Sequence, residues 1–182
     1  MKKKLLIIFF IILSVAAAIL AYFETHFPHF EFEQVRVSEE AALKDMPDAV
    51  FTGEDEALLR AVLALPEVQE ALGTEESLEF AKEICGGLKE YLPSGTTECK
   101  VYYVGSLSKS VNVVCEFGEE TTIQYLVNED LSHFEKAVAV YRRNIRGDTE
   151  LKEMYSNLDG EYTKYTEKRQ WFAYFRNRMW EE

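Results

Sequence analysis

The chain has 182 residues, 47% of them hydrophobic, and carries a formal net charge of −12 from 32 acidic and 20 basic residues. This acidic excess argues against nucleic acid as a partner, because a nucleic-acid interface needs a basic surface. The length allows one domain with a substantial core behind an N-terminal leader.

The N-terminal segment predicts a membrane helix. Lysines at positions 2–4 precede an apolar run at residues 5–23. At ~1.5 Å per residue its helical length is about 28 Å, close to the ~30 Å hydrocarbon core. The lysines before the run and the glutamates after it predict a cytoplasmic N-terminus and an extracytoplasmic remainder. We therefore expect residues 1–23 to form a transmembrane anchor, with the membrane as a partner through residues 5–23. The alternative is a signal peptide cut near Ala16 or Ala18, which would release a secreted domain.

Residues 24–37 are interpreted as a juxtamembrane linker with a possible short strand. Pro28 interrupts the linker, and the alternation of residues 30–37 is typical of a strand. His26 and His29 lie among glutamates, but the spacing marks no further ligand. We therefore expect no metal site and no cofactor.

The predicted fold of residues 38–182 is one extracytoplasmic α+β domain, in which a three- or four-stranded antiparallel meander packs against helices. A first helix signal begins at Ser38. A second helix is predicted after Glu54, and Pro66 is expected to kink or divide it.

Residues 74–92 predict a longer helix that covers one face of the sheet. Apolar side chains recur on one side of this segment. Gly86 and Gly87 lie inside it, and each costs about 1 kcal/mol relative to alanine in a helix. Either the helix breaks at this point or another element packs very closely against it.

Residues 99–127 contain three β-rich runs separated by short polar breaks. In such a meander the apolar face fixes the register, because a slip of one residue would turn each face outward. Three-residue loops are a common way to connect such strands. The predicted facing pairs are Val101 with Val113, Tyr103 with Val111, Cys115 with Ile123, and Val113 with Tyr125.

The same register places Cys99 opposite Cys115. Facing residues of antiparallel strands have Cα atoms about 4.5 or 5.5 Å apart, and a disulfide tolerates roughly 4.4 to 6.8 Å. A Cys99–Cys115 disulfide is therefore geometrically allowed in an oxidising compartment. The alternative is that Cys85, Cys99 and Cys115 are all small buried hydrophobic residues.

Two further helical segments are predicted after the meander. Apolar residues recur at helical intervals over residues 131–143. From Thr149 onward a similar spacing predicts one long helix or two short ones, with an interruption near Asp159 and Gly160.

The C-terminal segment reverses the charge balance, since residues 161–182 hold five Lys or Arg against four Glu. Basic and aromatic side chains together are typical of a partner or membrane contact. The candidate contact residues are Arg169, Trp171, Phe172, Phe175, Arg176, Arg178 and Trp180. The alternative, which we prefer, is that the segment packs back on the acidic domain.

No catalytic motif accompanies these features. Ser106 to Lys109 match a Ser-x-x-Lys pattern in letters only, because they lie on a predicted hairpin tip without the partner motifs. His133 is the sole histidine beyond the linker. We therefore predict a membrane-anchored extracytoplasmic binding or accessory domain that acts through protein–protein contacts rather than an enzyme. The alternatives are a tethered enzyme of unrecognised type and a small-ligand or peptide-binding domain.

Overall fold

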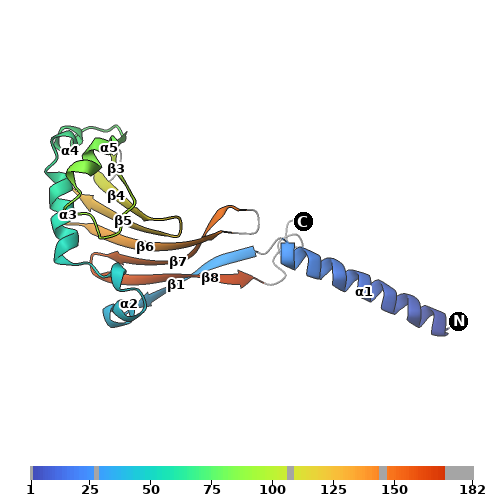
Figure 1. Ribbon diagram of the computed structural model, residues 1–182. Helices are drawn as coiled ribbons and strands as arrows, with labels where there is room; N and C mark the ends of the chain where they lie inside the picture. The colour runs from blue at the N-terminus through green and yellow to red at the C-terminus, as the bar shows by residue number, and fades with distance from the viewer. Residues whose placement is uncertain (1, 27–28, 106–108, 144–146, 171–182) are drawn as a thin grey trace. The chain divides into compact units, whose positions relative to one another are not determined.

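The computed structural model describes residues 2–26, 29–105, 109–143 and 147–170 (Figure 1). Contacts divide the chain into two units. One comprises residues 34–166, and the other comprises the described parts of residues 1–33 and 167–182.

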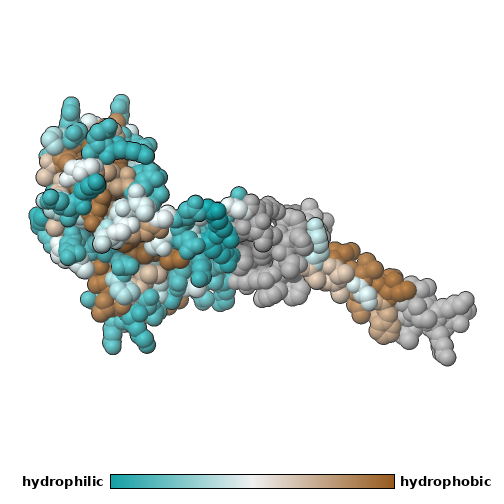
Figure 2. Space-filling view, viewed as in Figure 1, coloured by the Kyte–Doolittle hydropathy of each residue, from teal (hydrophilic) through white to brown (hydrophobic). Residues whose placement is uncertain are grey.

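The N-terminal unit contains the 25-residue helix α1, Lys2–His26. Its described side chains are mostly apolar and exposed, as the brown surface in Figure 2 shows, and Ile12 is 62% exposed. In the part of the chain that the structure describes, no helix is both long and apolar enough to cross a membrane. The predicted transmembrane helix is therefore wrong.

The three- or four-stranded sheet that we predicted is in fact eight-stranded. Its strand order is β1-β8-β7-β6-β5-β4-β3-β2, and consecutive strands from β2 to β8 pair in antiparallel fashion. The strands are β1 His29–Val37, β2 Leu78–Glu79, β3 Glu98–Val104, β4 Ser110–Phe117, β5 Thr121–Asn128, β6 Phe134–Arg143, β7 Thr149–Leu158 and β8 Glu161–Gln170.

The strands β3, β4 and β5 confirm the predicted meander. Every facing pair that the sequence predicted is present, including Val101 with Val113 and Val113 with Tyr125. Cys99 also faces Cys115. Alternating burial along β3 follows the same pattern, so the apolar face sets the register as expected.

Short helices lie along one face of this sheet (Figure 1). They are α2 Glu39–Asp45, the 3₁₀ turn η1 Pro47–Ala49, α3 Gly53–Leu63, α4 Pro66–Ala71 and α5 Lys82–Gly87. The Ser38 side chain caps α2, and Pro66 opens α4 as a separate helix. These elements confirm the early helix signals.

The helix predicted over residues 74–92 is largely absent. Only α5 is helical there, and it ends at Gly87. A Cβ atom at Gly86 or Gly87 would meet nothing within 4 Å, so no element packs against the glycines and the helix simply breaks. The preceding residues 78–79 form the short edge strand β2 instead.

The helices predicted over residues 131–143 and after Thr149 are also wrong as far as the chain is described, because these segments form β6, β7 and β8. The end of the second prediction, beyond residue 170, lies outside the described residues. Asp159 and Gly160 both have positive φ angles, of 48° and 87°. A two-residue Asp-Gly loop with this geometry is the tight turn that joins antiparallel strands. The spacing that looked helical therefore belongs to a hairpin.

The core lies between this helix layer and the facing side of the sheet. Large side chains that are almost fully buried come from α3 and from β3, β4, β5 and β6. From these elements they are Leu58, Leu59, Val62, Val101, Tyr103, Val111, Val113, Tyr125, Val127 and Val138, and Val68 of α4 and Leu88 after α5 are buried to the same degree. This packing fixes α3 above the centre of the sheet, where the candidate site lies.

Candidate functional site

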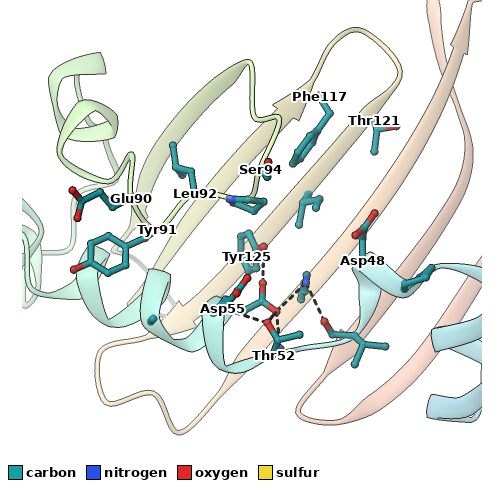
Figure 3. Close-up of a pocket in the computed structure, with 17 residues that line it drawn as sticks. Asp48, Thr52, Asp55, Glu90, Tyr91, Leu92, Ser94, Phe117, Thr121 and Tyr125 are labelled. Atoms are coloured by element: carbon teal, nitrogen blue, oxygen red, sulfur yellow. Dashed lines mark hydrogen bonds and ion pairs between the residues drawn. The ribbon is translucent and has the colours of Figure 1, made fainter.

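A cavity of about 810 Å³ lies between the helix layer and the sheet. Its walls come from η1, the start of α3 and the segment after α5, and its floor comes from β4, β5 and β6. Figure 3 shows Asp55 and Tyr125 at its centre, Glu90 and Tyr91 on one side and Asp48 on the other. The lining residues that matter below are Asp48, Thr52, Glu54, Asp55, Ala57, Glu90, Tyr91, Phe117, Tyr125 and Lys136.

A buried ion pair forms the polar part of the floor. The Lys136 ammonium donates hydrogen bonds to Asp55 Oδ2 at 2.9 Å and to the Val50 carbonyl at 3.0 Å. Asp55 is 6% exposed and Lys136 is 4% exposed. Because charges are buried in proteins only when they are paired and hydrogen-bonded, the two groups depend on each other.

The Asp55 carboxylate is also held from its own helix. Thr52 is the N-cap of α3, and Thr52 and Asp55 form a reciprocal capping box. The Thr52 backbone N–H donates to Asp55 Oδ2 at 2.7 Å, and the Thr52 hydroxyl donates to the same oxygen at 3.0 Å. One carboxylate therefore caps α3 and ties it to β6.

Tyr125 completes the network from β5. Its hydroxyl donates to Asp55 Oδ1 at 2.8 Å, so both carboxylate oxygens accept hydrogen bonds. Burial raises the pKa of the Tyr125 phenol far above its usual value, and the negative charge of Asp55 raises it further. The Lys136 ammonium lies 5.6 Å from the centre of the Tyr125 ring. Tyr125 therefore stays protonated and serves as a fixed donor.

The lining of the cavity is negatively charged overall. Its charged side chains are four carboxylates, from Asp48, Glu54, Asp55 and Glu90, and one ammonium, from Lys136. Since Asp55 and Lys136 neutralise each other, the carboxylates at the exposed mouth are left without a cation from the lining. The electrostatic potential of the cavity therefore favours a positively charged occupant.

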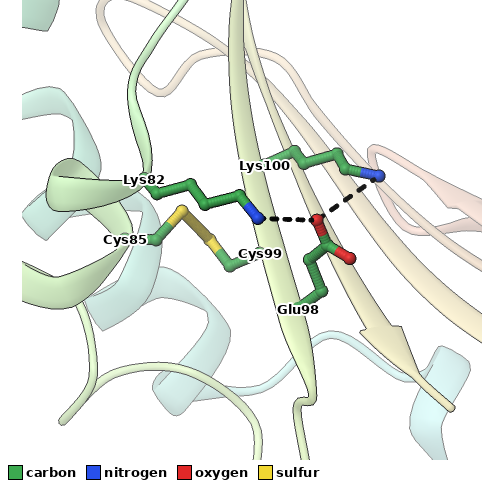
Figure 4. Close-up of a disulfide and its surroundings, with 5 residues drawn as sticks. All are labelled: Lys82, Cys85, Glu98, Cys99 and Lys100. Carbon is green, nitrogen blue, oxygen red and sulfur yellow. Dashed lines mark ion pairs between the residues drawn. A yellow bond between two sulfur atoms is a disulfide. The ribbon is translucent and has the colours of Figure 1, made fainter.

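The cysteines are connected differently from the prediction. Cys99 bonds Cys85, with Cα atoms 5.9 Å apart, and Cys115 is a buried free thiol (Figure 4). The predicted Cys99–Cys115 disulfide is therefore absent although the two residues face each other. The break of the helix after Gly87 brings Cys85 within bonding reach of β3, an arrangement that the strand register does not reveal.

Burial disfavours the thiolate form of the remaining cysteine. It raises the pKa of Cys115 to about 11, although a hydrogen bond with the Thr96 side chain opposes the shift. Beside the disulfide, the ammonium groups of Lys82 on α5 and Lys100 on β3 form ion pairs with the Glu98 carboxylate (Figure 4). Their Nζ atoms lie 3.7 and 3.9 Å from Glu98 Oε1. The disulfide and the Lys82–Glu98 pair connect α5 to β3. A disulfide is consistent with an extracytoplasmic domain.

The side chains of the predicted contact residues at the C-terminus all lie outside the described residues. The backbone of Arg169 lies in β8, and its side chain is outside the described residues. Residues 171–182, which hold Trp171, Phe172, Phe175, Arg176, Arg178 and Trp180, also lie outside them. Their role as a partner or membrane contact stays a prediction.

The residues weighed for catalysis or metal binding are only partly described, since the side chains of His26 and His29 lie outside the described residues. Ser106 to Ser108 also lie outside the described residues, and His133 Nδ1 lies 2.5 Å from Asp159 Oδ2 at the surface. Among the residues that the structure describes, no group of three or more His, Cys, Asp or Glu side chains could hold a metal ion.

Comparisons of the chain with protein-family models, with curated proteins and with solved structures find no match. The functional argument therefore depends on the geometry of the cavity.

Proposed function

We propose that this chain is an extracytoplasmic binding domain whose cavity takes a small, positively charged ligand or a basic side chain of a peptide. The observation that carries the proposal is the cavity of about 810 Å³ with a neutralised polar floor and an acidic mouth. Its volume lies within the range of roughly 300–1,000 Å³ that is typical of ligand sites. The geometry thus favours the ligand-binding alternative over contacts through a flat surface.

The carboxylates at the mouth of the cavity favour an occupant that is positively charged. Asp48, Glu54 and Glu90 are exposed, so their carboxylates are available to pair with an incoming cation. Tyr91, which is 44% exposed, and Phe117 add aromatic surface to the same lining. Aromatic faces attract cations, so the lining offers two independent sources of cation affinity.

The hydrogen-bond network supports binding rather than acid–base catalysis. The Asp55 carboxylate accepts hydrogen bonds on both oxygens, and one of its donors is the Lys136 ammonium. Both oxygens of this carboxylate are therefore occupied by donors within the protein, and burial raises the pKa of the Tyr125 phenol. The three groups therefore act as a rigid floor that needs no rearrangement when a ligand arrives.

We also propose that residues 5–23 direct the domain out of the cytoplasm and hold it at a membrane surface, or are removed after export. The exposed apolar side chains of α1 support this, because water does not stabilise such a surface. Membrane fractionation of the native chain, combined with the mass of its mature N-terminus, separates the two outcomes. An intact chain that stays entirely cytoplasmic would contradict both.

Titration of the full chain in mild detergent tests the cavity. The probes are spermidine and the peptide Ala-Lys-Ala, with Ala-Glu-Ala as the oppositely charged control. We expect the two cationic probes to bind and the anionic peptide not to bind. Ala57 is exposed on α3 and lines the cavity, so Ala57→Trp should fill the cavity and weaken binding at least about tenfold.

A matched variant separates filling of the cavity from a general effect of tryptophan. Glu70 is exposed on α4 and does not line the cavity, so Glu70→Trp should leave binding unchanged. Cationic probes that bind Ala57→Trp as well as the native chain would refute the site. Equal binding of Ala-Lys-Ala and Ala-Glu-Ala, or no binding of either cation, would refute the proposed ligand class.

A further inference from the structure

Cys99 is adjacent to both of the other cysteines of the chain. Cys85 on α5 bonds Cys99 on β3, and Cys99 faces the free thiol of Cys115 on β4. Facing residues of an antiparallel pair point to the same side of the sheet, with Cα atoms about 4.5 or 5.5 Å apart. This separation lies inside the range of roughly 4.4 to 6.8 Å that a disulfide accepts. Cys99 therefore has two partners within bonding reach.

We propose that this chain carries an internal disulfide exchange, in which Cys115 displaces Cys85 from Cys99. The Cys115 thiolate attacks Cys99 Sγ, the Cys99–Cys115 bond forms, and the Cys85–Cys99 bond breaks. The electron pair of the broken bond leaves on Cys85, which takes up the proton that Cys115 lost. One disulfide and one thiol are present before and after the step, so no oxidant or reductant is consumed.

The two disulfides are similar in the loop that they close. Cys85 and Cys99 are 14 residues apart, and Cys99 and Cys115 are 16 residues apart. Because the entropic effect of a disulfide changes slowly with loop length, chain entropy favours neither connection strongly. Packing around α5 and around the β3–β4 hairpin then determines whether the Cys85–Cys99 or the Cys99–Cys115 disulfide predominates.

The exchange would change the covalent attachment of the cavity wall that residues 90–94 form. The loop closed by Cys85 and Cys99 contains residues 90–94, all of which line the cavity. The six-residue helix α5 ends in two glycines, and a helix this short depends on tertiary contacts. When Cys85 leaves Cys99, this wall loses its covalent link to β3. The effect on binding rests on the proposed function of the cavity, whereas the exchange itself does not.

Burial controls the rate of the step. Cys115 is fully buried, and its pKa of about 11 leaves little thiolate at neutral pH. The charged and titratable groups that face it are Asp55 on α3, Lys136 on β6 and Tyr125 on β5. Asp55 and Lys136 form a neutral pair, so the thiolate fraction below pH 11 rises with pH and limits the exchange.

Trapping with N-ethylmaleimide tests the exchange in the full chain. Cys85 is half-buried, whereas Cys115 is 0% exposed, so the reagent captures Cys85 as soon as it is released. We expect the label on Cys85, a Cys99–Cys115 disulfide in the peptide map, and a rate that rises about tenfold per pH unit between about pH 7 and 9. A label on Cys115, or no label within the time in which urea-unfolded protein reacts completely, would overturn the exchange.

Two variants keep the test decisive. Cys115→Ser lacks the attacking thiol and should take up no label, so labelling of Cys85 in this variant would also overturn the exchange. Cys85→Ser should form the Cys99–Cys115 disulfide on oxidation, and two free thiols after oxidation would count against it. The trapped protein should bind spermidine at least about tenfold more weakly than the untreated chain. Unchanged binding there would refute only the effect on the cavity wall.

Discussion

Replacement of Lys136 with methionine removes the ammonium from the buried pair and keeps a side chain of similar length. The variant loses the 2.9 Å hydrogen bond to Asp55 and the 3.0 Å hydrogen bond to the Val50 carbonyl. It leaves a carboxylate that is 6% exposed without a cation. Breaking a buried pair in this way typically costs about 3–5 kcal/mol, a large part of a domain stability of about 5–15 kcal/mol.

A second substitution shows where this cost arises. Asp55→Asn in the Lys136→Met background removes the uncompensated charge while an amide oxygen still accepts from Thr52. We expect the double variant to recover about 1–3 kcal/mol relative to Lys136→Met alone. A recovery of this size would show that the unpaired Asp55 carboxylate, rather than lost packing, is the main cause of the lower stability of Lys136→Met.

Urea unfolding at neutral pH, followed by far-ultraviolet circular dichroism, measures both changes. The control is Arg60→Met on α3, whose ion pair with Glu56 has side chains 63% and 49% exposed. Exposed pairs contribute about 0–1 kcal/mol, so this control should unfold almost like the native chain. The reasoning would be refuted if Lys136→Met lost no more stability than Arg60→Met, or if Asp55→Asn destabilised the Lys136→Met chain further.

Three further predictions follow from the contacts around the core. Tyr125→Phe removes a 2.8 Å hydrogen bond to a charged acceptor, so its free energy of unfolding should fall by about 1.5–3 kcal/mol in the same urea assay. Hydrogen bonds from Tyr155 and Lys164 lower the pKa of Asp45, so its stabilising effect is present above about pH 3.8 and is lost as the pH falls through the lower folded pKa. The difference in urea midpoint between the native chain and Asp45→Asn should therefore be constant near neutral pH and shrink below pH 3.8, and a difference that grew in acid would contradict this sign. A Cβ at Gly105 would meet the backbone of Glu75 and Glu76 at 2.8 Å, whereas one at Gly86 meets nothing within 4 Å. Gly105→Ala should thus destabilise the domain by about 1–3 kcal/mol and Gly86→Ala should stabilise it by up to about 1 kcal/mol, and equal effects would contradict the close contact.

The meander was predictable because one local pattern determined it. The alternation along residues 99–127 identifies the buried face, and the short breaks fix which residues face each other. The early helices were equally accessible, since Ser38 and Pro66 mark their starts. In these segments no distant contact was needed to choose between alternatives.

The later strands were missed because two patterns compete in them. In β6 apolar residues lie on both faces of the sheet, with Ala137 and Ala139 alternating with the inward-facing Val138. This hides the period of two and leaves a spacing that resembles a helix. The turn at Asp159 and Gly160 was the available signal, because Asp-Gly between two such runs is typical of a hairpin.

The candidate site was missed for the same reason. Asp55 was interpreted only as a favourable charge in the first turn of a helix. The helical spacing predicted for residues 131–143 gives Lys136 no inward position, whereas in β6 it faces Tyr125 directly. A lysine at an inward position of a strand requires a buried anion, and that requirement would have led to Asp55.

The order of strands also has a kinetic consequence. From β2 to β8, each strand pairs with its neighbour in sequence, so most of the sheet forms from local hairpins. The Asp55 network is different, because it joins residues 70 and 81 positions apart in the chain. Closing such long loops is entropically unfavourable early in folding, so we expect α3 to dock after the sheet has formed. The ion pair should therefore govern how fast the domain opens rather than how fast it forms, a difference that stopped-flow unfolding and refolding of the Lys136→Met chain would reveal.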